Sequence, residues 1–158
     1  MKNKRMSVIL IMLAITLALS VFGFSACRDD KGETDGICTV VIATGEAIED
    51  YEVEISKVSV KNGLLSVLEY LQDEKKISFE YSGTNSSAYL TKINGFVSGT
   101  DGNHIYIYTS VEKDFDVSGE YKSTVEYKGE TLTSTGVGAS LMTIEDKAVI
   151  YIGTVNFG

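Results

Sequence analysis

Histidine and cysteine, the usual ligands of zinc, are scarce in this chain of 158 residues. The single histidine is His104, and Asp114 and Asp116 bring two carboxylates into one polar loop that continues to Glu120. A neutral imidazole binds transition metals, whereas carboxylate oxygens bind calcium, which takes roughly 6–8 oxygen ligands. Because the loop lacks the further ligands of an EF-hand, His104, Asp114 and Asp116 are a weak candidate metal site. The competing interpretation is an exposed turn histidine and a solvated acidic loop.

Catalytic signatures are missing from the sequence. His104 has no serine or cysteine partner at a recognisable spacing, so a catalytic triad cannot be argued. The chain contains no G-x-S-x-G, phosphate-loop or H-E-x-x-H motif. Gly136 and Gly138 precede a short polar stretch and a strand instead of a helix, which predicts a bend. We therefore expect a protein that is not an enzyme.

Tyrosines form the strongest candidate recognition surface. The chain has 9 tyrosines and no tryptophan. Tyr106 and Tyr108 alternate with Ile105 and Ile107 in one predicted strand, so the two pairs point to opposite faces. If the isoleucines face the core, both tyrosines face outward and offer flat rings with polar tips to a ligand. The alternative is that the tyrosine face packs against the helix.

The N-terminal segment predicts export and a lipid anchor. Residues 1–26 combine a basic start with a long apolar run, as a signal peptide does. Phe24–Cys27 resembles the bacterial lipobox, in which cleavage precedes a cysteine that receives acyl chains such as palmitate. Two acyl chains hold a protein firmly on a bilayer. Cys27 is thus the expected lipidation site, on the outer face of the bacterial cytoplasmic membrane. A plain signal peptide or an uncleaved membrane anchor is the alternative.

The rest of the chain reads as a tethered, acidic domain. Residues 27–36 are polar and glycine-containing, which is typical of a flexible tether. Beyond residue 26 the chain has 11 Lys and Arg against 22 Asp and Glu, a net charge of −11, which argues against nucleic acid as a partner. Cys38 lies in an apolar strand, where it is either a small buried hydrophobe or a reactive thiol.

Hydrophobic periodicity predicts one helix among several strands. The expected helix covers 64–74, because Leu64, Leu68 and Leu71 recur on one face. The expected strands cover 37–43, 51–55, 77–81, 88–93, 104–109, 124–128, 130–133 and 148–152. This order predicts an α+β fold, a β-grasp-like mixed sheet with the amphipathic helix packed on one face. The last strand is apolar on both faces and is expected in the centre.

Several segments together resemble the transcobalamin-like C-terminal domain of secreted and lipid-anchored bacterial proteins. The segments that carry this resemblance are 62–68, 89–95, 105–108, 136–139 and 149–152. The resemblance covers 37–153 and leaves 154–158 as a C-terminal tail. The family's aromatic strand usually carries a tryptophan, which this chain lacks.

The resemblance implies a β-grasp-like fold and a corrinoid as a candidate ligand. In eukaryotic cobalamin carriers this domain covers one face of the corrin ring beside a helical domain, which this chain lacks. Tyr89 and Asn94, in one of the resembling segments, join Tyr106 and Tyr108 as candidate ligand-binding residues. We therefore expect a non-enzymatic, lipid-anchored binding protein for a small ligand such as cobalamin. The alternatives are a module that contacts surface protein or glycan, and a metal-binding surface lipoprotein.

Overall fold

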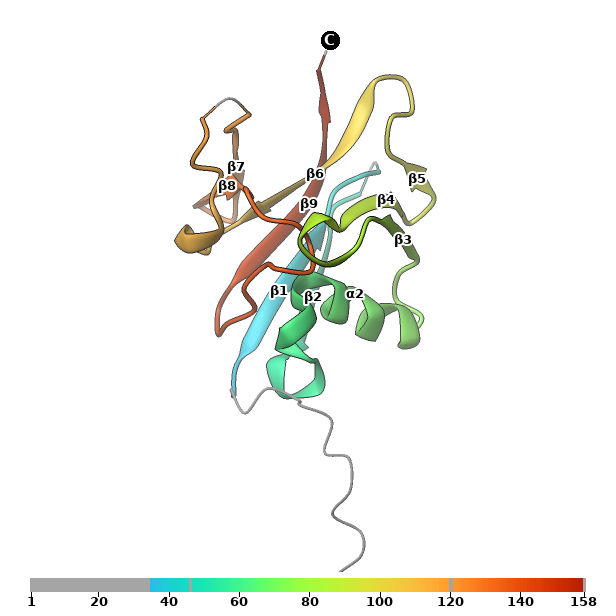
Figure 1. Ribbon diagram of the computed structural model, residues 1–158. Coiled ribbons are helices and arrows are strands. Elements are labelled where there is room, and N and C mark those ends of the chain that lie inside the picture. Colours follow the sequence, from blue (N-terminus) through green and yellow to red (C-terminus); the bar gives the residue numbers. More distant parts are fainter. Residues whose placement is uncertain (1–34, 46, 120, 158) are drawn as a thin grey trace, which may run out of the picture. The chain divides into compact units, whose positions relative to one another are not determined.

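The computed structural model describes residues 35–45, 47–119 and 121–157. The expected signal peptide, Cys27 and most of the expected tether lie outside these ranges. Among the described residues, no helix is long and apolar enough to cross a membrane. The fold is α+β, as the sequence predicts (Figure 1).

A six-stranded mixed sheet has the order β2-β1-β9-β6-β8-β7. Its strands are β1 (Ile37–Ile42), β2 (Glu49–Glu54), β6 (Asn103–Thr109), β7 (Thr124–Tyr127), β8 (Glu130–Ser134) and β9 (Val149–Asn156). β1 and β9 are parallel, and every other pair in this sheet is antiparallel. The last strand is therefore central, as expected, and the sheet has the predicted β-grasp-like character.

One amphipathic helix, α2 (Gly63–Asp73), packs against this sheet (Figure 1). Leu64, Leu68 and Leu71 are completely buried, as their spacing predicts. They share one hydrophobic core with Val40 of β1 and Ile150 of β9. Burying each large aliphatic side chain contributes about 1.5–3 kcal/mol to folding. Short 3₁₀ helices cover Ile55–Lys57 (η1), Val60–Asn62 (η2), Asn85–Ser87 (η3) and Glu112–Asp114 (η4).

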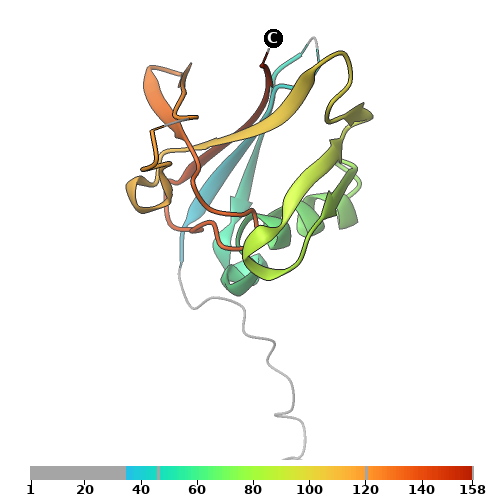
Figure 2. The ribbon, with the colours of Figure 1, turned by 45° about the horizontal axis from the view of Figure 1, so that its top comes forward.

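A separate three-stranded sheet has the order β3-β4-β5 (Figure 2). Its strands are β3 (Phe79–Ser82), β4 (Tyr89–Ile93) and β5 (Phe96–Val97). Asn94 and Gly95 link β4 to β5 with φ angles of +45° and +86°, as a tight hairpin turn requires. The sequence analysis expected a single sheet and did not find β5, because a two-residue strand has no measurable alternation.

The sheet face opposite α2 carries aromatic side chains. Ile107 on the helix side packs against the main core, whereas Tyr106 and Tyr108 lie on the other face, as the alternation predicts. On that face Tyr108 lies beside Tyr151 of β9, with ring centroids 6.0 Å apart. Val41 of β1 is completely buried on the same face. The opposite face is therefore partly closed by its own side chains.

The final strand is longer than the sequence predicts. The segment 154–158 was expected to be a C-terminal tail, but β9 continues to Asn156. The reason is pairing: Thr154, Val155 and Asn156 lie opposite Ile105, His104 and Asn103 of β6. Backbone pairing can thus extend a strand into polar sequence that carries no apolar signal.

Candidate functional site

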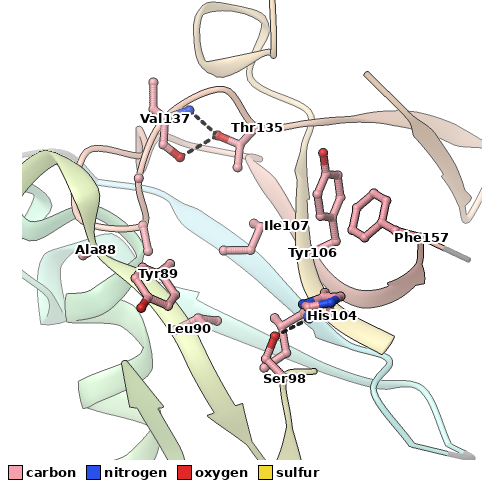
Figure 3. Close-up of a pocket in the computed structure, with 13 residues that line it drawn as sticks. Ala88, Tyr89, Leu90, Ser98, His104, Tyr106, Ile107, Thr135, Val137 and Phe157 are labelled. Carbon is pink, nitrogen blue, oxygen red and sulfur yellow. Dashed lines mark hydrogen bonds between the residues drawn. The ribbon is translucent and has the colours of Figure 1, made fainter. Parts of the chain in front are cut away.

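A cleft of about 450 Å³ lies between β4 and β6, and we call it the β4–β6 cleft (Figure 3). Among the described residues, its lining combines aromatic, aliphatic and small side chains and includes no Asp, Glu, Lys or Arg. The lining residues are Ala88, Tyr89, Leu90, Ser98, His104, Ile105, Tyr106, Ile107, Thr135, Val137, Gly138, Ala139 and Phe157. Clefts of this size and composition are typical of small-molecule sites.

The cleft exists because the segment before β6 turns away toward β4 and leaves the middle of β6 unpaired on that edge. Gly99 donates its N–H to the Asn103 carbonyl at 2.7 Å, as in an ordinary hairpin. One residue earlier, Ser98 donates its N–H to the Thr91 carbonyl of β4 instead. On the far side, β8 pairs only with Tyr108 and Thr109 of β6. The middle of β6 therefore has an open edge that faces β4.

Two backbone groups on this open edge are already occupied. The Ile105 N–H donates to the Ser98 hydroxyl at 3.0 Å, and the Ile107 carbonyl accepts from the Thr135 N–H at 2.9 Å. Both residues thus turn their backbone groups away from β9. Among the described residues, the Ile105 carbonyl and the Ile107 N–H have no hydrogen-bond partner. The cleft consequently presents one free acceptor and one free donor from the same strand edge.

One wall of the cleft is aromatic. The ring of Phe157 lies 5.8 Å from the rings of both Tyr106 and His104, measured between centroids. The Tyr106 hydroxyl donates to the Tyr121 carbonyl at 2.8 Å, which fixes the direction of the ring. Partial burial, and secondarily the negative charge of Asp116, raises the pKa of Tyr106. Tyr106 is therefore a neutral hydrogen-bonded ring at physiological pH.

The opposite wall comes from β4 and from the loop that follows β8. Figure 3 shows Tyr89 across the cleft from Tyr106 and Phe157, with Ile107 between them. Tyr89 is 58% exposed and its ring has room to pack against a ligand. Ala139 donates its N–H to the Ala88 carbonyl at 2.9 Å and so anchors the loop to the second sheet. The cleft is thus built from segments far apart in the sequence.

Tyr108 differs from its expected role. It was expected to face solvent beside Tyr106, but it is only 6% exposed and does not line the cleft. The reason is packing, because its ring contacts both Tyr106 and Tyr151 edge to face. Its hydroxyl also accepts a hydrogen bond from the Ser123 hydroxyl at 3.4 Å. Tyr108 supports the aromatic wall from behind.

Asn94 also lies outside the cleft. Its side-chain carbonyl accepts the Ser78 N–H at 3.0 Å, and its amide donates to the Glu49 carboxylate at 3.2 Å. These bonds join the β4–β5 turn to β2 and to the segment before β3. The structure therefore gives Asn94 a bridging position between strands and not a place beside the other candidate ligand-binding residues.

The three candidate metal ligands do not form a metal centre. His104 lies in the β4–β6 cleft, whereas Asp114 is buried and accepts the Thr143 N–H at 2.6 Å and the Thr143 hydroxyl at 3.1 Å. Asp116 accepts bonds from the Ser118 N–H and hydroxyl, and these bonds lower its pKa. Within the described ranges, no three His, Cys, Asp or Glu residues are grouped so that they could hold a metal ion.

Asp114 also corrects the expectation of a fully solvated acidic loop. With 4% exposure it is the one buried charged residue of the described part of the chain. Its backbone carbonyl accepts the Gly136 N–H, while its carboxylate holds Thr143. A buried carboxylate is tolerated when it is hydrogen-bonded in this way. The hydrogen bonds of Asp114 therefore hold two loops together and do not indicate a cation site.

A second hollow, of about 650 Å³, lies beside the edge of β1 and β2. Its acidic lining residues are Asp35, Glu52, Glu54 and Asp146. Two of these carboxylates already have protein partners, because Glu54 pairs with Lys57 and Asp146 accepts the Ile37 N–H. We therefore regard this hollow as a polar surface feature.

The sequence analysis missed Phe157 and Ser98. Phe157 lay in the expected tail, although the alternation of Tyr151, Gly153, Val155 and Phe157 could have placed its ring on the tyrosine face. Ser98 has no sequence signal, because its role depends on where β5 separates from β6. Both residues belong to the β4–β6 cleft.

Comparison with known proteins gives a fold and no family. No family model and no curated protein sequence matches the chain. Among solved structures, the chain resembles a proposed metal-binding protein from Ruminococcus gnavus ATCC 29149, with a TM-score of 0.50 and 11% sequence identity. The match covers 78% of this chain and 100% of that chain. At this level of identity the likeness concerns the fold alone.

Proposed function

We propose that this protein is a non-enzymatic binding module whose ligand lies in the β4–β6 cleft. The observation that carries the proposal is the convergence of Tyr89, Tyr106 and Phe157, from three separate segments, around one open hollow of about 450 Å³. Aromatic side chains with one polar end are well suited to hold a ligand that is partly apolar. The tyrosine hydroxyls and His104 would supply the polar contacts.

The resemblance noted in the sequence suggests a corrinoid as the ligand. A hollow of about 450 Å³ would hold one edge of a corrin ring and leave the rest in solvent. His104, at the end of the cleft beside Phe157, is the imidazole that could face the cobalt ion. The described lining residues include no carboxylate or ammonium group, which suits a ligand with a large apolar body.

Titration of the full chain in detergent with cobinamide, followed by absorbance, tests this proposal. We expect saturable binding that Tyr89→Ala weakens about tenfold, since removing one stacking ring costs about 1 kcal/mol or more. Tyr81→Ala is the matched control, because Tyr81 is 47% exposed on β3 but lies outside the cleft. His104→Ala should change the cobalt absorption bands. An equal loss of affinity in both tyrosine variants would contradict the cleft as the binding site. If the wild type does not bind cobinamide, the corrinoid is not the ligand.

Lipid anchoring of this module through Cys27 is the second part of the proposal. It is supported by the basic start, the apolar run and the small residues before the cysteine. We expect Cys27→Ala to leave an unlipidated precursor that metabolic labelling with palmitate does not mark. Normal processing and labelling of the variant would contradict the assignment and, with it, the proposed location on the outer face of the cytoplasmic membrane.

Metal binding is the alternative function, and the description of the R. gnavus protein is the observation that favours it. The described part of this chain offers His104 and scattered carboxylates without a cluster of three. A melting temperature that falls on addition of EDTA and recovers with zinc or calcium would support this alternative. An unchanged melting temperature would leave the cleft proposal as the better explanation.

A further inference from the structure

The free groups on the edge of β6 have the spacing of a parallel β-pair. The Ile105 carbonyl and the Ile107 N–H belong to residues i and i+2 and face the same side of the strand. In parallel pairing, one residue of the partner strand donates its N–H to the carbonyl of residue i. The same residue accepts the N–H of residue i+2 with its own carbonyl. The cleft therefore offers main-chain bonds to one residue of an extended peptide.

The neighbouring groups on the edge limit this pairing to that one residue. The Ile105 N–H is occupied by the Ser98 hydroxyl, and the Ile107 carbonyl by the Thr135 N–H. An antiparallel partner could also bond to these two groups, but only through two different residues, those on either side of the residue opposite Tyr106. Ser98 and Thr135 already bond to the edge at those two flanking positions, so the parallel orientation, in which one peptide residue makes both bonds, fits the edge better.

The lining of the cleft indicates the side chains that such a peptide would carry. Leu90, Ile107 and Val137 supply aliphatic surface, and the chain as a whole has a net charge of −8. In this acidic protein the part of the cleft that the structure describes has no Asp, Glu, Lys or Arg, which matches an uncharged segment. Extended peptides bind open sheet edges through backbone bonds, and pockets for alternate side chains add specificity.

We propose that the ligand of the β4–β6 cleft is an extended, uncharged peptide segment that runs parallel to β6. One of its residues donates its N–H to the Ile105 carbonyl and accepts the Ile107 N–H. This inference rests on the proposed function, because it uses the same cleft, and it names a peptide as the alternative to the corrinoid. In this arrangement β6 binds the peptide backbone, and the aromatic wall packs against one side chain of the peptide.

Calorimetric titration of the full chain in detergent micelles tests the inference, with blank micelles as the background. The probes are blocked pentapeptides, Ac-Ser-Thr-Xaa-Thr-Ser-NH₂, in which Xaa is Val, Ile, Leu, Phe or Tyr. We expect the best of them to bind, and an ester in place of the N–H of Xaa to weaken it about fivefold. Loss of one hydrogen bond costs about 0.5–1.5 kcal/mol, which corresponds to this factor.

Hydrogen exchange provides the readout on the protein. The bound peptide should slow exchange of the Ile107 amide at least about fivefold and leave the Ile105 amide, already bonded to Ser98, unchanged. Peptide binding without an ester penalty, or without protection of Ile107, would overturn the inference and leave the cleft as a binding site. If cobinamide binds but no peptide binds at millimolar concentration, the peptide inference likewise fails and the cleft remains a binding site. If neither probe binds, both the inference and the proposed function fail.

Discussion

The hydroxyl of Tyr127 on β7 donates a hydrogen bond to the carboxylate of Asp50 on β2 at 2.9 Å. These strands are the two edges of the six-stranded sheet, so the twist of the sheet brings side chains of its two edges together across the aromatic face. Lys128 forms an ion pair with the same carboxylate, and the Tyr127 ring lies 6.1 Å from that of Tyr151. This contact joins residues 77 positions apart in sequence. It bounds the face on which Tyr106 and Tyr108 lie.

The edge contact predicts a pH-dependent contribution to stability. Hydrogen bonds from Lys128 and then Tyr127 lower the pKa of Asp50 in the folded state. A carboxylate with a lowered folded pKa stabilises the fold above its unfolded pKa of about 3.9, and the contribution is lost as the pH falls through the folded value. We expect Asp50→Asn to lower the melting temperature modestly at pH 6 and to have no effect at the acidic end of the pH range, where Asp50 is protonated. Because the pair is largely exposed, high salt should reduce the difference.

Melting curves of the wild type and of Asp50→Asn between pH 2 and pH 7 check this expectation. Glu52→Gln, a change in the same strand, is the control, since no ion pair or hydrogen bond links Glu52 to the β7–β8 hairpin among the described residues. A melting difference that stays constant over the whole pH range would contradict the role given to Asp50.

Asp114 is expected to be structural. Replacement by alanine leaves the partly buried Thr143 N–H and hydroxyl without their acceptor, and we expect the free energy of unfolding to fall by about 1–3 kcal/mol. Asp116→Ala, in the same loop, should have a much smaller effect, because its partner Ser118 is exposed. Urea denaturation measures both changes. A rise of the melting temperature with calcium that Asp114→Ala abolishes would instead assign the carboxylate to a cation site.

Local pattern predicted much of the fold. The helix Gly63–Asp73 and the central strand β9 follow from apolar spacing, because burial on one face or on both faces leaves a direct trace in sequence. The separation of the second sheet left no such trace. It depends on Ser98 bonding to Thr91 of β4 rather than continuing along β6, and both partners are uncharged polar residues of the kind common in strands and turns alike.

The candidate site was predicted in part for the same reason. Tyr89, Tyr106 and His104, which the sequence analysis selected for their side-chain chemistry, come together in the β4–β6 cleft. Tyr108 was expected beside them because period two places it on the same face as Tyr106. Alternation gives the face but not what covers it, and Tyr151 and Ser123 cover Tyr108.

Cys38 is expected to be unreactive in the folded protein. It is completely buried, and burial raises the pKa of its thiol to about 11. Because the thiolate is the reactive form, modification should require opening of the sheet. In a Cys27→Ser background in detergent, we expect DTNB at pH 8 to label Cys38 at least about a hundredfold more slowly without denaturant than in guanidinium. Rapid labelling of the folded chain would show that β1 opens or that the thiol is accessible.

Gly138 is the position where the cleft depends most directly on the absence of a side chain. A Cβ there would lie 2.4 Å from the Ser86 carbonyl oxygen and 3.2 Å from that of Ala88. Both oxygens belong to the backbone, so the loop would have to move away from β4. We expect Gly138→Ala to lower the free energy of unfolding by about 1–3 kcal/mol.

The same displacement should widen the β4–β6 cleft, since Val137, Gly138 and Ala139 form one of its walls. Gly138→Ala should therefore weaken cleft ligands, measured with cobinamide and the blocked pentapeptides, by more than its effect on stability explains. Gly45→Ala is the matched control, because a Cβ there meets no atom within 4 Å and its effect should stay within about 0.5 kcal/mol. If Gly138→Ala binds both probes as the wild type does, the loop does not shape the site, and the ligand must contact the β6 and β4 walls alone.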